Sequence, residues 1–264
     1  MQLSVNESQF ILNLTFVMPN HCLNSLTISG ITEYQWLEIA ATIDCSEDSK
    51  TSFLQTFYPE PKWDNIPNQQ GELPSLNNGR GSRCWSDGTQ DHRWYDWRNQ
   101  HWGTKWDIFD CSNDFLQEEP GTEFSMSFST AWSPLSENCM QEISKHFPGA
   151  LLTNYYEEEG EDFCGVTVAQ NGIALDYSTE LSGIRELYVR KEIPNLPEDA
   201  DIYDAYEENE LWGGFRDFLL ERLDGNASDL LKELQEKFKC YPERCIELWN
   251  SYQLGISTLP VGLA

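Results

Sequence analysis

Alternation between apolar and small polar residues predicts several strands in the first 170 residues. Leu26 and Ile28 alternate with polar residues over 23–29, so a strand should run there with these two side chains facing inward and end at Gly30. The alternation is clearest over 124–128, where Phe and Met alternate with Ser. A further strand is expected over 101–109. Two more, over 150–156 and 163–169, should form a hairpin with a solvated acidic turn at 157–162.

Apolar residues at helical spacing predict two helices between these strands. Thr32 can cap the first, whose apolar residues are Trp36, Leu37, Ala40 and Ile43. Ser133-Pro134 opens the second, whose apolar residues are Leu135, Cys139, Ile143 and Phe147. Residues 57–88 are rich in Pro, Gly, Asn and Ser and should form a long loop.

The order of these elements is strand, helix, two strands, helix and hairpin. It predicts an α+β fold, with a ferredoxin-like antiparallel sheet and helices on one face. We place this domain at residues 18–172, after an N-terminal extension of residues 1–17 that includes a short apolar segment at 10–16. Both Met1 and Met18 are candidate start residues.

Residues 173–264 are expected to form an acidic linker and a helical C-terminal region. One helix carries apolar residues over 211–219 and should break at Asp224-Gly225-Asn226. A second helix is expected over 230–238, and Pro242 should start a third.

The net charge of the chain limits the classes of molecule that it is expected to bind. The chain of 264 residues has 44 Asp and Glu against 17 Lys and Arg, a formal net charge of -27. Such a surface repels phosphate backbones and acidic lipid, so direct binding to nucleic acid or to a membrane is disfavoured. Two interpretations remain: an ordinary acidic protein, or a surface that imitates a polyanion.

The cysteines indicate a reducing compartment. The eight cysteines are scattered without a CxxC pair, and the chain begins without a basic segment typical of a signal peptide. We expect free thiols in the cytoplasm. No apolar run approaches the roughly 20 residues that span a bilayer.

One segment departs from this acidic background. Residues 83–106 hold half of the ten tryptophans together with Arg83, Arg93, Arg98 and Lys105. In a strand, Trp102 and Trp106 would point to one side and pack as a pair of core indoles, with Gly103 allowing close approach of a neighbour. A pocket, a partner surface or a base-stacking surface is the functional alternative.

Four short strings resemble a known family. They are Met18-Pro19-Asn20-His21-Cys22-Leu23-Asn24, Trp102-Gly103-Thr104-Lys105-Trp106-Asp107, Thr130-Ala131-Trp132-Ser133-Pro134 and Asp162-Phe163-Cys164-Gly165. In this order they are similar to signature strings of YubB-like plasmid and phage proteins, over residues 18–172. The resemblance implies a ferredoxin-like domain and a mobile-element setting, and it implies no catalytic residues.

The sequence contains no motif that indicates a catalytic, metal or cofactor site. Cys84, His92, His101 and Cys111 match no zinc spacing, and nucleophile, phosphate-loop and dinucleotide motifs do not occur. We therefore predict no catalytic residues, no metal site and no cofactor, and a protein that is not an enzyme.

The sequence leads to a functional hypothesis based on charge. We expect a phage-encoded protein in the host cytoplasm that inhibits a nucleic-acid-dependent defence enzyme by binding its basic surface, with an acidic run acting as a DNA mimic. The predicted partner-binding residues are Glu198, Asp199, Asp201, Asp204, Glu207, Glu208 and Glu210, with Trp94, Trp97 and Arg98 as anchors. A solvated linker or helix is the alternative explanation of the acidic run.

Two other functions stay open. In the first, Arg93, Arg98 and Lys105 hold the phosphate of a nucleotide in a pocket of the Trp-rich segment. In the second, the chain is a structural homo-oligomer.

Overall fold

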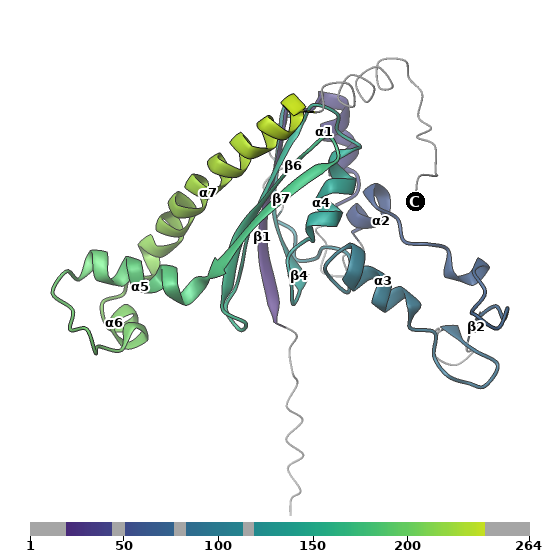
Figure 1. Ribbon diagram of the computed structural model, residues 1–264, viewed down its shortest axis with the longest axis horizontal. Coiled ribbons are helices and arrows are strands. Elements are labelled where there is room, and N and C mark those ends of the chain that lie inside the picture. Colours follow the sequence, from purple (N-terminus) through teal and green to yellow (C-terminus); the bar gives the residue numbers. More distant parts are fainter. Residues whose placement is uncertain (1–19, 44–50, 77–82, 113–118, 241–264) are drawn as a thin grey trace, which may run out of the picture.

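The computed structural model describes residues 20–43, 51–76, 83–112 and 119–240, and it is built around one five-stranded antiparallel sheet. The order across the sheet is β4-β1-β5-β6-β7, with helices on both faces (Figure 1). The strands are β1 (His21–Ser29), β4 (Glu123–Ala131), β5 (Leu151–Glu158), β6 (Phe163–Gln170) and β7 (Ile173–Glu180). The structure is therefore an α+β fold, as the sequence predicts.

The predicted inward face of β1 is confirmed. Leu26 and Ile28 are fully buried, and they lie opposite Met126 and Phe124 of β4 in the register of the pair. The strand predicted over 124–128 is confirmed as the central part of β4. Because side chains alternate between the two faces of a strand, this register directs both apolar rows to the same side of the sheet.

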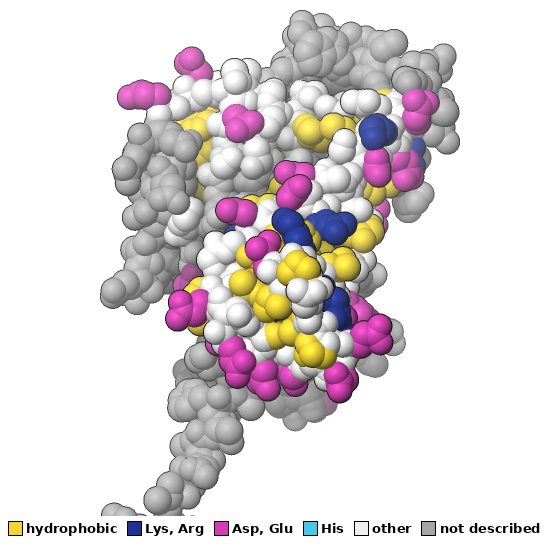
Figure 2. All heavy atoms as spheres, turned by 90° about the vertical axis from the view of Figure 1, so that its left-hand side faces the viewer, with side chains coloured by type: hydrophobic (Ala, Val, Ile, Leu, Met, Phe, Trp, Pro, Cys, Tyr) yellow, Lys and Arg dark blue, Asp and Glu magenta, His cyan; other side chains and the backbone are white. Residues whose placement is uncertain are grey.

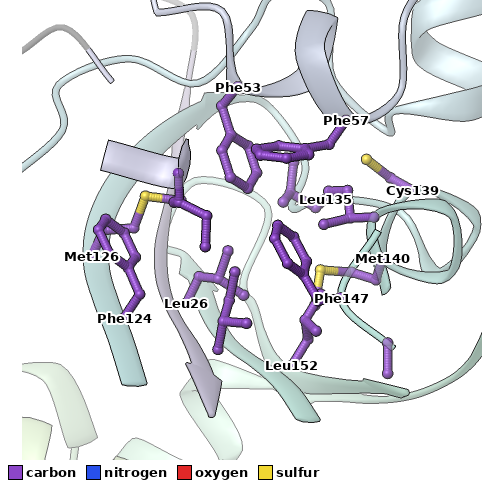
Figure 3. Packing of buried hydrophobic residues seen from close by; sticks show 14 of the residues in the cluster. Leu26, Phe53, Phe57, Phe124, Met126, Leu135, Cys139, Met140, Phe147 and Leu152 are labelled. Atoms are coloured by element: carbon purple, nitrogen blue, oxygen red, sulfur yellow. The ribbon is translucent and has the colours of Figure 1, made fainter. Parts of the chain in front are cut away.

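Three helices cover that side of the sheet and close the main core: α1 (Glu33–Ala40), α2 (Phe53–Phe57) and α4 (Glu137–Ser144). Thr32 caps α1 in a capping box with Gln35, as its position in the sequence predicts. Ser136 caps α4, so this helix begins later than the Ser133-Pro134 pair suggests. Figure 3 shows Phe53 and Phe57 of α2 lying over the core, among residues of α4 and the sheet.

The opposite side of β5, β6 and β7 is covered by the C-terminal part of the chain. It consists of α5 (Leu181–Glu192), α6 (Ile202–Glu208) and the long helix α7 (Trp212–Cys240). Leu234 of α7 is fully buried against Val166, Val168 and Leu175 of the sheet. In Figure 1, α7 lies along one side of the sheet, and α4 lies on the other.

Three sequence predictions for secondary structure are wrong. Residues 101–109 form no strand: the chain leaves the helix α3 (Arg93–His101) and runs through bends to a single bridge between Phe109 and Ser129. The expected break at 224–226 does not occur, because α7 is continuous. The strand β7, beyond the predicted domain boundary at residue 172, was not expected.

Two other segments refine the predictions. The expected loop over 57–88 contains a short 3-10 turn η1 (Trp63–Asn65) and a small hairpin of β2 (Ser75–Leu76) and β3 (Arg83–Cys84). In the turn at 157–162, Glu159 is exposed, but Glu158 is buried and accepts hydrogen bonds from the backbone N–H groups of Gly160 and Glu161. That turn is therefore only partly solvated.

Some predictions fall outside the described residues, namely the apolar segment at 10–16 and the helix from Pro242. Among the helices that the structure describes, none is both long and apolar enough to cross a membrane.

Candidate functional site

The acidic run predicted to bind a partner lies in a small helical lobe. We call α5, α6 and residues 212–223 of α7 the acidic lobe. Asp201 caps α6, because its side chain accepts hydrogen bonds from the backbone N–H groups of Tyr203 and Asp204. Ala205 and Tyr206 face inward and are buried. The central part of the acidic run is thus a capped helix packed on the rest of the lobe, and Glu198, Asp199 and Glu210 flank it.

All the acidic side chains of this run lie on the surface. Each of the seven is exposed, and within the described part of the chain none forms an ion pair with Lys or Arg. They are Glu198, Asp199, Asp201, Asp204, Glu207, Glu208 and Glu210. Their charge is therefore directed to solvent and is available to an outside partner.

Arg185 organises the interior of the acidic lobe. Its guanidinium lies 5.3 Å from the ring centroid of Tyr206 and 5.4 Å from that of Phe215, and it pairs with Glu159 of the turn between β5 and β6 at 3.0 Å. A second ion pair, between Arg216 and Glu157, also joins the lobe to the sheet. These contacts hold the acidic surface in a fixed orientation.

Apolar side chains accompany the acids on this lobe. Tyr203 is 60% exposed, and Trp212 and Leu187 are each 51% exposed. Figure 2 looks at this side of the molecule and shows hydrophobic side chains gathered on the lobe, with acidic side chains along its edge. Exposed aromatics within a charged rim are typical of protein-binding surfaces.

The Trp-rich segment forms a separate cluster around α3, in which Arg93, Arg98 and Lys105 lie against aromatic rings, whereas Arg83 pairs with Asp64 at 2.8 Å. The Arg93 guanidinium is 5.2 Å from the Trp63 ring and 4.7 Å from the Trp85 ring. Its Nε and Nη2 donate to the buried carboxylate of Asp91 at 2.9 and 2.8 Å. Burial alone would raise the pKa of Asp91, but the hydrogen bonds from Arg93 hold it below its ordinary value.

Arg98 repeats this arrangement one turn later in α3. Its guanidinium lies 5.1 Å from Trp94 and 4.9 Å from Trp102, and it is paired with Glu60. Trp102 is fully buried, and its indole N–H donates to the carbonyl of Tyr58 at 2.8 Å. The two arginines expected to hold a phosphate are therefore already neutralised by carboxylates.

Lys105 lacks such a partner. Its ammonium lies 4.6 Å from the Trp106 ring, 5.4 Å from Trp132 and 5.8 Å from Tyr95, and it forms no ion pair within the described residues. Trp106 is 39% exposed, so it does not form a buried pair with Trp102 as the strand prediction required. Trp132 has a positive φ of 68°, a strained conformation for a bulky residue.

A pocket of about 440 Å³ opens beside this cluster and is lined in part by Arg98, Trp102 and Trp106 of the Trp-rich segment, where a pocket was one of the open alternatives. Asp107 lies in its wall, half-buried, and accepts hydrogen bonds from the N–H groups of Leu54, Gln55 and Ile108 at 2.9 to 3.1 Å. Burial raises the pKa of Asp107 to about 6, although these hydrogen bonds oppose the shift. Most of the lining residues lie within 98–109, but Thr51 and Gln55 come from a distant part of the chain, and no local motif indicates that contact.

The structure separates the residues predicted as one partner-binding set. The acidic run lies in the lobe next to α5, whereas Trp94, Trp97 and Arg98 lie on α3, on the other side of the molecule (Figure 1). Trp97 is half-buried and stacks on His101 at 4.4 Å between ring centroids. The three anchors therefore pack within the α3 cluster and do not share a surface with the acids.

Three buried cysteines among the described residues are poorly suited to act as nucleophiles. Burial raises the pKa of the Cys22 thiol to about 12 and that of Cys164 to about 11, and it also raises that of Cys139. Among the described residues, no group of three or more His, Cys, Asp and Glu side chains could hold a metal ion.

Comparison with known proteins identifies one domain. Residues 105–205 match the family model described as a ferredoxin-like domain in Api92-like protein, which confirms the predicted ferredoxin-like α+β fold. The match runs from the bends after α3 to the middle of α6 and so includes β7. The predicted domain boundaries themselves stay a prediction.

A solved structure and the curated proteins complete the comparison. The crystal structure of a protein api92 from Yersinia pseudotuberculosis is 12% identical, and the alignment covers 61% of this chain and 98% of that one with a TM-score of 0.31. No curated protein matches the chain.

Proposed function

We propose that this protein is a binding protein whose acidic lobe occupies the basic, nucleic-acid-binding surface of another protein. The observation that carries the proposal is the set of seven exposed carboxylates on and beside α6 that have no cationic partner within the described part of the chain. Carboxylates in this state can accept charge-assisted hydrogen bonds from the Arg and Lys side chains that ordinarily hold phosphates.

The lobe also offers contacts that a purely electrostatic surface would lack. Tyr203 and Trp212 are more than half exposed and lie next to the acids along the chain. Aromatic side chains contribute much of the affinity of protein interfaces, whereas complementary charge mainly contributes specificity and the rate of association. A net charge of -27 would steer a basic partner toward the lobe and repel competing nucleic acid.

The resemblance to plasmid and phage proteins favours a particular partner. We propose a host enzyme of the nucleic-acid-dependent defence class, which the lobe would inhibit by competing with its substrate. Action in the host cytoplasm and the absence of catalysis belong to the same proposal.

A pull-down from host lysate tests the proposal. The full chain is immobilised, and the lysate is applied with and without nuclease and washed at low and high salt. We expect a DNA- or RNA-binding protein that is retained after nuclease treatment, released by salt and displaced by added duplex DNA. Capture that requires intact nucleic acid would contradict direct binding.

Matched charge reversals locate the binding surface. The test variant replaces Asp204, Glu207, Glu208 and Glu210 with Lys, and leaves the capping residue Asp201 in place. The control variant makes the same change at four exposed acids elsewhere, namely Glu33, Glu38, Asp96 and Glu119. The lobe variant should lose the partner and the control should retain most of it, and equal losses would show that only overall charge matters.

A further inference from the structure

We propose that the pocket beside Asp107 binds a small planar aromatic cation, such as a ring that carries an amidinium or guanidinium group. This site is separate from the acidic lobe and does not depend on the function proposed for that lobe. The argument rests on Asp107, on the neutralised state of Arg98 and on the aromatic residues Trp106 and Phe109 of the pocket wall.

Asp107 supplies a hydrogen-bond acceptor that its neighbours do not saturate. Oδ1 accepts from the N–H groups of Leu54 and Ile108, at 3.0 and 2.9 Å, whereas Oδ2 accepts only from Gln55, at 3.1 Å. A carboxylate has about four acceptor positions, so capacity remains on Oδ2. Within the described residues, Asp107 forms no ion pair, and a cationic donor would supply one.

The charge balance of the pocket disfavours an anion. Arg98 also lines the pocket, but its Nε and Nη2 already donate to Glu60 at 2.9 and 2.6 Å, and its Nη1 donates to the carbonyl of Lys105 at 3.3 Å. The guanidinium is thus offset by a carboxylate, and Asp107 contributes a further negative charge when it is ionised. Lys105, the cation of the Trp-rich segment without an ion pair among the described residues, does not line the pocket, so a phosphate ligand, as the sequence suggested for this segment, would meet the Asp107 carboxylate there.

The aromatic walls favour a flat, positively charged ligand. Trp106 and Phe109 line the pocket, with their rings 6.4 Å apart in an edge-to-face arrangement. The faces of aromatic rings attract cations, and the Lys105 ammonium at 4.6 Å shows that the Trp106 indole already does so. A volume of about 440 Å³ suits a molecule of one or two rings.

Three isosteric probes test the proposal on the full-length protein. Benzamidine is the planar cation, benzamide its neutral counterpart and benzoate its anionic counterpart. Binding is followed in two-dimensional NMR through the indole N–H signal of Trp106, which is assigned by its loss in Trp106→Phe. We expect benzamidine to shift this signal in a saturable manner, and benzamide and benzoate to bind at least ten-fold more weakly.

Variants distinguish the pocket from non-specific attraction to an acidic protein. Trp106→Ala and Asp107→Asn should each weaken benzamidine binding at least five-fold, whereas Trp212→Ala, which removes an exposed indole from the acidic lobe, should not change it. In Trp106→Ala, which lacks the Trp106 indole signal, binding is followed through the backbone N–H signals of the pocket residues Ile108 and Phe109. If Asp107→Asn fails to fold, as a thermal melt would show, the three probes on the unmodified chain still decide the question.

Three results would overturn the proposal. The first is benzoate binding as tightly as benzamidine. The second is no saturable shift of the Trp106 signal at millimolar probe, and the third is benzamidine affinity unchanged in Trp106→Ala. None of these results bears on the acidic lobe, since the four charge reversals there leave the pocket residues intact.

Discussion

Arg98 donates two hydrogen bonds to Glu60, from Nε at 2.9 Å and from Nη2 at 2.6 Å. The two residues are 38 positions apart, so the pair fastens α3 to the chain that follows α2. Both side chains are mostly shielded from water, with 20% and 15% of their areas exposed. An ion pair in this state is costly to break on one side, because the remaining charge is left without a partner.

We therefore expect Glu60→Ala and Arg98→Ala each to lower the free energy of unfolding by about 2 kcal/mol. Chemical denaturation of the two single variants and the double variant measures the coupling. The double variant should lose less than the two single losses added together, because the contact is shared. Strict additivity would show that the pair contributes nothing beyond its separate side chains.

Gly103 has a positive φ and lies close to the backbone of residues 134–136, so an added Cβ would be unfavourable for two reasons. Its φ is +83°, and an added Cβ would lie 2.7 Å from the carbonyl O of Pro134 and 2.7 Å from the N of Ser136. Gly103→Ala should therefore destabilise the protein by at least about 2 kcal/mol, through backbone strain together with overlap. Denaturant midpoints measure this loss.

Gly71 is a matched control for that variant. Its φ is +81°, but an added Cβ would meet nothing within 4 Å. Gly71→Ala should cost only the conformational penalty, about 1 kcal/mol. Equal losses of unfolding free energy in Gly103→Ala and Gly71→Ala would mean that the close approach of residues 134–136 to Gly103 does not affect stability.

Elements with a clear local pattern were predictable from the sequence. β1 and β4 alternate apolar and polar residues, and Thr32 is followed by Gln35 at the spacing of a capping box. Each of these signals lies within one segment and agrees with the way the segment packs. The acidic run was also visible, because exposed charges need no distant contact to be recognised.

Elements stabilised by distant contacts were not predictable. β7 is partly exposed along its length and lacks a clean alternation, and it is a strand because it pairs with β6 over eight residues. The bends after α3 carry Trp102 into the core through a hydrogen bond to Tyr58. The Asp107 pocket likewise brings Thr51 and Gln55 against residues 98–109, and no spacing in the sequence indicates that contact.

The continuity of α7 shows how packing overrides local preference. Gly225 lowers helix propensity, but apolar residues on both sides of it, Leu223 and Leu234, are buried. An added Cβ at Gly225 would meet nothing within 4 Å. Gly225→Ala should therefore stabilise the protein by up to about 1 kcal/mol, measured as a higher melting temperature.

Gly214, near the start of the same helix, provides the contrast. A Cβ there would overlap the hydroxyl of Tyr188, a residue buried in the lobe. Gly214→Ala should lower the melting temperature, although the gain in helix propensity is the same. A rise at both positions would show that the contact between α5 and α7 adapts easily.

Asp107 should give the stability of the protein a distinct dependence on pH. Burial raises its pKa from the ordinary 3.8 to about 6, so the folded state binds a proton more tightly than the unfolded chain does. The stability that protonated Asp107 contributes is present below about pH 3.8 and is lost as pH rises through about 6. The loss is on the order of 3 kcal/mol, since one pKa unit corresponds to about 1.4 kcal/mol.

The difference in unfolding free energy between the unmodified protein and Asp107→Asn isolates the effect of Asp107 from the repulsion among the other acids, which both proteins share. We expect the unfolding free energy of the unmodified protein, relative to the variant, to fall as pH rises from 4 to 7. The matched substitution at the exposed residue Asp217 should give a difference that changes little over the same range. A flat difference for Asp107→Asn would mean that water reaches this carboxyl and that its wall of the pocket is open.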